Sequence, residues 1–73
     1  MAARALPVAC IEKKRLLNAF AHAVSEYNRM NSAQALAVMR GEGFQFTQEV
    51  GVAGRRMDNA KYAILKHEQE HGC

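Results

Sequence analysis

Tryptophan is absent from this chain of 73 residues, and there are only one proline, three phenylalanines and two tyrosines. Hydrophobic residues still make up 49% of the sequence, but many of them are alanines, so any core is thin and its elements are closely spaced. β-Branched residues are also few, whereas the strong helix formers dominate. This composition predicts an all-α fold.

Long hydrophobic runs are absent as well. The opening stretch, MAARALPVAC, ends in a cysteine, but Arg4 interrupts its apolar residues and charged residues follow from Glu12. A secretion signal needs a continuous apolar segment of about 7–15 residues, and a membrane span needs about 20. We therefore expect a soluble, cytoplasmic protein with no membrane partner.

Positive charge is modest, with a net charge of +3 and a pI near 9.2. The basic residues cluster only at Lys13, Lys14 and Arg15 and at Arg55 and Arg56, without interleaved aromatic residues. On a helix, such clusters usually belong to the solvent-exposed face. A nucleic-acid partner is not expected, and binding through these residues would weaken steeply with salt.

The single proline marks the expected start of a first helix. Pro7 closes a loose tail, residues 1–7, and proline is well tolerated in the first turn of a helix. Apolar residues then recur at spacings of three and four, which predicts a helix with one buried face. This face consists of Cys10, Leu16, Leu17, Phe20, Ala23, Val24, Tyr27, Met30 and Ala37. The residues expected on the solvent side are Asn18, His22, Ser25, Glu26 and Arg29.

Two glycines predict where this helix ends. Asn31 and Ser32 offer a weak break, but the strongly helical residues after them favour one helix over about 8–40. Gly41 and Gly43 then predict a turn over 41–46, since glycine adopts the left-handed conformation that ends many helices.

A second helix is expected over about 47–71, with Thr47 as a candidate N-cap. Gly51 and Gly54 each cost roughly 1 kcal/mol in a helix, so a firm start only at Arg55 is the alternative. Apolar residues keep a strict heptad spacing along this segment. They are Phe46, Val50, Ala53, Met57, Ala60 and Ile64, and His67 and His71 continue the spacing.

These elements predict a single domain, residues 8–73, folded as an antiparallel two-helix hairpin. A chain this short buries too little apolar surface to be stable without a staple or a partner. We therefore expect a homodimer in which two hairpins form a four-helix bundle. The expected interface residues are Phe20, Val24, Tyr27, Met57, Tyr62, Ile64 and Leu65.

The open end of this hairpin would bring four potential metal ligands together. His67 and His71 share one face of the second helix, and the fold-back places Cys10 beside the segment that ends in Cys73. Tetrahedral zinc takes such a set of imidazoles and thiolates. A disulfide between the cysteines and a plain, frayed helix end are the alternatives.

The same segment, HEQEH, matches the H-E-x-x-H pattern of metalloproteases. We do not expect a protease, since a hairpin of this size cannot build a substrate cleft around the motif. The favoured hypothesis is a non-enzymatic interaction or regulatory module that acts as a homo-oligomer, has no cofactor and meets a protein partner through Tyr62, Leu65 and nearby basic residues. The alternative is a zinc-binding or thiol-responsive protein that uses the open end.

Overall fold

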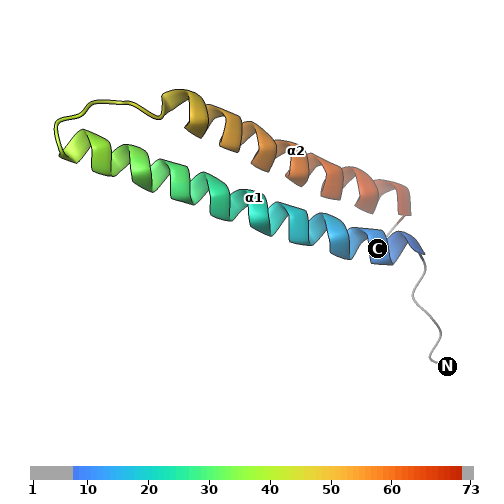
Figure 1. Ribbon diagram of the computed structural model, residues 1–73. Coiled ribbons are helices and arrows are strands. Elements are labelled where there is room, and N and C mark those ends of the chain that lie inside the picture. Colours follow the sequence, from blue (N-terminus) through green and yellow to red (C-terminus); the bar gives the residue numbers. More distant parts are fainter. Residues whose placement is uncertain (1–7, 72–73) are drawn as a thin grey trace.

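The computed structural model describes the chain from residue 8 to residue 71, with side chains from residue 11 to residue 70. Two helices, α1 (Val8–Met39) and α2 (Thr47–His71), pack against each other. They run in opposite directions, so the start of α1 and the end of α2 lie at the same end of the molecule (Figure 1). The prediction of an all-α antiparallel hairpin is confirmed.

The paired glycines end α1 in a Schellman motif. Gly41 has a φ of +78° and Gly43 a φ of +85°, a region of backbone conformation that other residues rarely adopt. The Gly41 amide donates to the Val38 carbonyl at 3.0 Å, and the Glu42 amide donates to the Ala37 carbonyl at 2.8 Å. These bonds satisfy carbonyls that a helix end otherwise leaves without partners. The glycines therefore set the point where the chain reverses.

Gln34, on α1, holds the start of α2. Its side-chain oxygen accepts the Phe46 backbone N–H at 2.7 Å, and its amide nitrogen donates to the Thr47 hydroxyl at 3.1 Å. The Thr47 hydroxyl also donates to the Phe44 carbonyl at 3.4 Å. Thr47, the predicted N-cap, thus uses its hydroxyl to join the turn to α1.

One register holds along the whole hairpin. Contacts between the helices join Lys13 to Glu68, Tyr27 to Gly54, and Gln34 to Thr47. The two residue numbers add up to the same value in every pair. The alignment of the two antiparallel helices is therefore constant from the open end to the turn. The ion pair between Lys13 Nζ and Glu68 Oε2, at 2.9 Å, lies at the open end.

Large and small side chains alternate across the seam between the helices. Within one residue of this register, Phe20 lies level with Ala60, Met57 with Ala23, and Tyr27 with Ala53. Among the described residues, only Ala37, Ala53 and His67 are buried, and no large side chain is fully buried. An isolated hairpin therefore has a thin core, as its size predicts.

The seam of α1 is narrower than the predicted apolar face. It consists of Leu16, Phe20, Ala23, Tyr27, Met30, Gln34 and Ala37, all at least half-buried. Leu17 lies outside it and is 45% exposed, so its predicted burial is wrong for this hairpin. The reason is that α1 has two neighbouring apolar stripes, and only one of them contacts α2.

Two further expectations about the helices need correction. Glu26 was expected on the solvent side, but it is half-buried beside the seam. A firm start of α2 at Arg55 is also wrong, because α2 begins at Thr47 and contains both Gly51 and Gly54. α1 runs without a break through Asn31 and Ser32.

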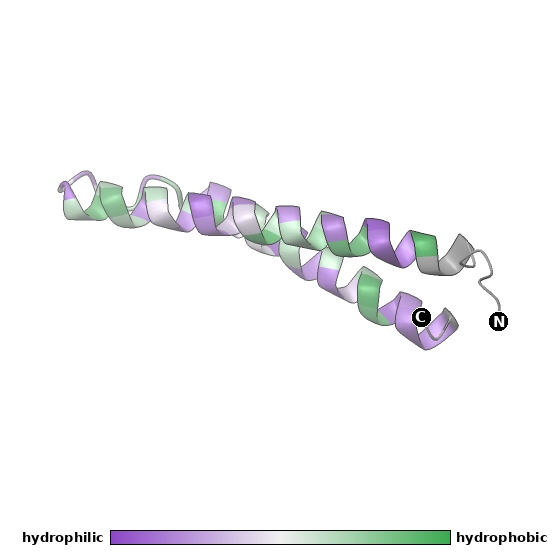
Figure 2. Ribbon diagram, turned by 90° about the horizontal axis from the view of Figure 1, so that it is seen from below, coloured by the Kyte–Doolittle hydropathy of each residue, from purple (hydrophilic) through white to green (hydrophobic). Residues whose placement is uncertain are grey.

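Hydrophobic and hydrophilic residues alternate along the side of α1 that faces away from α2 (Figure 2). Within residues 8–71, neither helix offers an apolar stretch that would reach across a bilayer.

Candidate interaction surfaces

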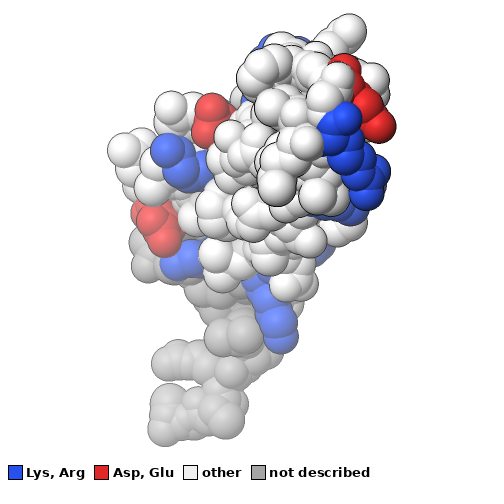
Figure 3. All heavy atoms as spheres, turned by 90° about the vertical axis from the view of Figure 1, so that its left-hand side faces the viewer, with Lys and Arg blue, Asp and Glu red and all other residues white. Residues whose placement is uncertain are grey.

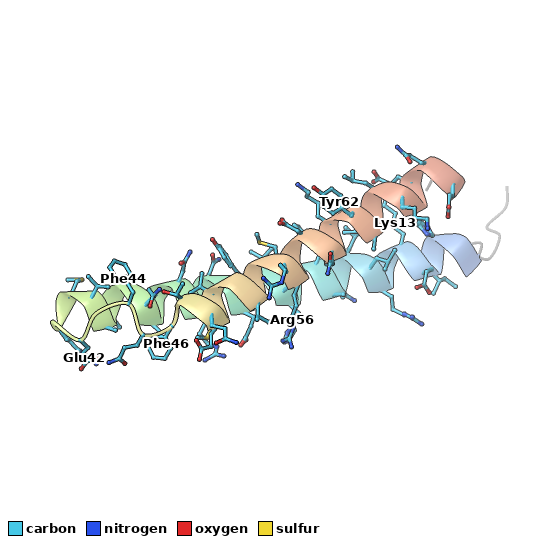
Figure 4. All side chains as sticks on the ribbon, turned by 90° about the horizontal axis from the view of Figure 1, so that it is seen from above. Lys13, Glu42, Phe44, Phe46, Arg56 and Tyr62 are labelled. Atoms are coloured by element: carbon cyan, nitrogen blue, oxygen red, sulfur yellow. The ribbon has the colours of Figure 1, made fainter. Side chains whose placement is uncertain are left out.

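The hairpin has two flanks, one on each side of the seam. Residues that directly precede a seam residue, such as Ala19, Glu26 and Arg56, line cavities on one flank. Residues that directly follow a seam residue, such as Leu17 and Val24, lie on the other flank, because the helix turns about 100° per residue. Arg56 and Tyr62 accordingly leave α2 on opposite sides (Figure 4).

The flank that bears Leu17 is called the apolar face. On α1 it follows a second heptad stripe, and on α2 it includes Gly51, Gly54 and Leu65 together with the charged residues Asp58, Lys61 and Glu68. The α1 stripe consists of Leu17, Ala21, Val24, Asn28, Asn31, Ala35 and Val38. Phe44 and Tyr62 project to the same side of the molecule (Figure 4).

Five of the eight exposed large hydrophobic side chains among residues 11–70 lie on this side of the hairpin, with Leu17, Val38 and Leu65 on the apolar face itself and Phe44 and Tyr62 beside it. Their exposed fractions are 45% for Leu17, 37% for Val38, 73% for Phe44, 59% for Tyr62 and 46% for Leu65. Scattered exposed apolar residues are normal on a monomer, but a set that follows one flank of a hairpin makes that flank a candidate interaction surface.

The opposite flank is called the charged groove. It contains two cavities of about 390 Å³ and 420 Å³, which share Glu26, Ala53 and Arg56 and so form one continuous depression. Its lining combines Glu49, His22 and the shared Glu26 and Arg56 with smaller apolar residues such as Ala19, Val52 and Ala60. Seen from the turn, the end of the hairpin is mainly uncharged, with charged side chains toward its edges (Figure 3).

Glu26 is the central acid of the charged groove. The Arg29 guanidinium donates hydrogen bonds to both of its carboxylate oxygens. This hydrogen bonding is the main reason that the pKa of Glu26 lies below its ordinary value, and the charges of Arg29, His22 and Arg56 act in the same direction. The Arg29 pKa is raised by the same bond. The central acid of the groove is therefore paired with a neighbouring arginine on the same helix.

The residues predicted at a dimer interface occupy two places. Four of them, Phe20, Tyr27, Met57 and Ile64, are half-buried in the seam within the hairpin. The other three lie outside the seam: Val24 is half-buried on the apolar face, Leu65 is exposed on it, and the exposed Tyr62 projects to the same side.

The basic clusters do not form one surface. Lys13 pairs with Glu68 at 2.9 Å, and Arg15 pairs with Glu12 at 3.3 Å. Arg56 lies at the charged groove, level with Ser25 of α1 and thus about 18 Å along the helix axis from Lys13. This separation is unlike the continuous basic stripe that tracks a phosphate backbone.

Of the four predicted zinc ligands, the structure describes the side chain of His67 alone. It is buried in the seam near the open end, with 7% of its surface exposed. Cys10 and His71 lie in the helices, but their side chains, like Cys73 and any disulfide to it, fall outside the described residues. Within the described part of the chain, no three potential ligands converge. The zinc site and the disulfide therefore stay predictions.

Two features of these surfaces were missed by the sequence reasoning. The clamp by Gln34 was missed because a polar residue in an apolar seam does not fit the heptad pattern. The second stripe was merged with the first, although its own spacing of four and three is readable from Leu17 to Val38.

No protein-family model, curated protein or solved structure matches this chain.

Proposed function

We propose that this chain is a non-catalytic interaction module that acts as a homodimer, in which two hairpins join through their apolar faces to form a four-helix bundle. The observation that carries this proposal is the row of exposed hydrophobic side chains on the apolar face, beside a core in which no large side chain among residues 11–70 is fully buried. Burying such a row is the usual source of stability for a chain of this size.

The architecture supports the same proposal. Two helices form a single layer, whereas a stable domain buries its apolar surface between two packed layers. A second copy is the favoured occupant, since it offers an apolar face of the same length and composition.

The two flanks differ in how well they suit such an interface. On the apolar face, small residues such as Ala21, Ala35 and Gly51 allow close approach of another helix. In the charged groove, association would remove Glu26, Arg29 and Arg56 from water. This desolvation costs free energy, and the existing ion pair between Glu26 and Arg29 does not offset the cost. The apolar face is therefore the dimer surface in this proposal.

Three leucines with similar exposure provide the test. Leu17 and Leu65 lie on the apolar face at 45% and 46% exposure, and Leu36 lies off it at 49%. Leu17→Glu or Leu65→Glu removes about 1.5–3 kcal/mol of burial and adds a desolvated charge. Each should weaken dimerisation by at least about 100-fold, since 1.4 kcal/mol corresponds to a factor of ten.

Leu36→Glu is the matched control, and it should leave the dimer intact. Light scattering coupled to size exclusion measures the mass, and circular dichroism verifies that each variant stays helical. The proposal fails if Leu17→Glu and Leu36→Glu have the same effect on mass, or if the unchanged chain is a monomer.

A further inference from the structure

The stripe of α1 on the apolar face has a nearly symmetric order. Asn28 and Asn31 stand at its centre, with Val24 and Ala21 before them and Ala35 and Val38 after them. Both asparagines are exposed in the single hairpin and make no contribution to its seam. Polar residues at the centre of an otherwise apolar helix interface are known to fix register and orientation.

We propose that the two copies pack with their α1 helices antiparallel, with the two-fold axis passing between Asn28 and Asn31. This inference rests on the proposed dimerisation and adds its geometry. In this register Asn28 of each copy lies level with the partner's Asn31, Val24 lies level with the partner's Ala35, and Ala21 lies level with the partner's Val38.

Side-chain size favours this register. The seam within the hairpin already sets each large residue against a small one, as with Tyr27 and Ala53. The antiparallel register repeats this rule between copies, because valine meets alanine on both sides of the axis. Interdigitated large and small side chains fill an interface without voids.

Hydrogen bonding favours it as well. A carboxamide both donates and accepts, so Asn28 and the partner's Asn31 satisfy each other when they lie level. The two-fold axis generates this pair twice, and all four carboxamides then have partners within one small cluster. An asparagine that faced an apolar residue would stay unsatisfied and would weaken association.

Charge disfavours the parallel alternative. Parallel α1 helices in register would set Lys14 beside the partner's Lys14 and would bring both open ends, with their basic residues at 13–15, together. Like charges that face each other across an interface weaken association. The antiparallel arrangement separates the two Lys14 residues by roughly 45 Å along the helix axis, given a rise of 1.5 Å per residue.

Disulfide trapping tests this geometry. The background is the Cys10→Ser, Cys73→Ser double variant, provided that it has the same oligomeric state in solution as the unchanged protein. Ala21→Cys and Val38→Cys are made in separate chains, which are then mixed and mildly oxidised. The mixture should cross-link, whereas each variant alone should not, because its thiols lie about 25 Å apart and a disulfide needs Cα atoms within about 7 Å. Ser25→Cys, exposed on the outer side of α1, measures random collision.

The mixed pair should form the disulfide at least about tenfold faster than Ser25→Cys, because the interface raises the effective concentration of the thiols. Cross-linking of Ala21→Cys to itself, or no preference for the mixed pair in a dimeric background, would overturn the proposed geometry while leaving dimerisation intact. A monomeric unchanged protein would instead remove the proposed function.

The unchanged chain provides an independent measurement if the cysteine-free background does not dimerise. Equal amounts of ordinary and isotope-labelled protein are mixed and treated with a short lysine cross-linker, and peptides are identified by mass spectrometry. A mixed-isotope link between two copies of Lys14 contradicts the antiparallel register. In the antiparallel register the lysines of one copy stay at least about 28 Å along the helix axis from those of the partner, so a dimeric sample without lysine links between copies is the expected result.

Discussion

The apolar face and the charged groove lie on either side of the same seam, yet they offer different chemistry to another molecule. The groove pairs its own charges, with Glu26 bonded to Arg29, and contains open cavities. The apolar face exposes Leu17, Leu65 and their neighbours in the single hairpin. This difference is the reason that the proposed dimer uses the apolar face and leaves the groove open.

The largest change in the strength of association is expected when Asn28 and Asn31, the polar centre of the apolar face, are replaced. Asn28→Leu combined with Asn31→Leu replaces two amides by side chains that each gain about 1.5–3 kcal/mol on burial. Association should tighten by more than about 100-fold. Register and oligomeric state should become mixed, because the residues that specify them are lost.

Sedimentation velocity measures this change as several species in place of one. The matched control is Asn18→Leu combined with Ser25→Leu on the exposed outer side of α1. If both double variants sediment alike, the asparagines do not lie at the interface.

An intermediate effect, on the free energy of unfolding, is expected from replacing Gln34, which lies in the seam between the two flanks. Gln34→Ala removes the acceptor for the Phe46 N–H and the donor to Thr47. Loss of a partner for a partly buried polar group costs about 1–3 kcal/mol of unfolding free energy. Urea unfolding followed by circular dichroism measures the loss, and Gln45→Ala in the exposed turn is the control. A Gln34→Ala variant as stable as the Gln45→Ala variant would contradict the clamp.

The smallest effect on stability is expected from Glu26→Gln in the charged groove. The pKa of Glu26 in the folded protein lies below its ordinary value of 4.5, so its ionised form favours folding above pH 4.5. This contribution is lost as the pH falls through the lowered pKa, because the protonated carboxyl no longer pairs with Arg29. The melting temperature of the unchanged protein should therefore slightly exceed that of Glu26→Gln at pH 7 and should match it at low pH. A difference that grows below pH 4.5 would reverse the assigned sign.

The sequence predicted the hairpin well because its signals were local and strong. Gly41 and Gly43 marked the turn, and the heptad from Phe46 to His67 marked the buried side of α2. The rotation of α1 was not predictable to one residue, because Leu16 and Leu17 are equally apolar and belong to adjacent stripes. Only the partner helix, through contacts such as Tyr27 with Gly54, decides which stripe is the seam.

The candidate interaction surfaces were predictable in part. Tyr62 and Leu65 stood out because they broke the heptad of α2, and both prove to be exposed. The charged groove gave no sequence signal, since its lining comes from residues of two helices that meet only after the chain reverses. The proposed zinc ligands depend on Cys10, His71 and Cys73, so their geometry stays a prediction.

Sedimentation equilibrium of the unchanged protein over a range of concentrations tests the central claim most directly. The account predicts a species with twice the monomer mass of 8.1 kDa, which dissociates on dilution. A fully helical species that keeps the mass of one chain at the highest concentration of the series would contradict it.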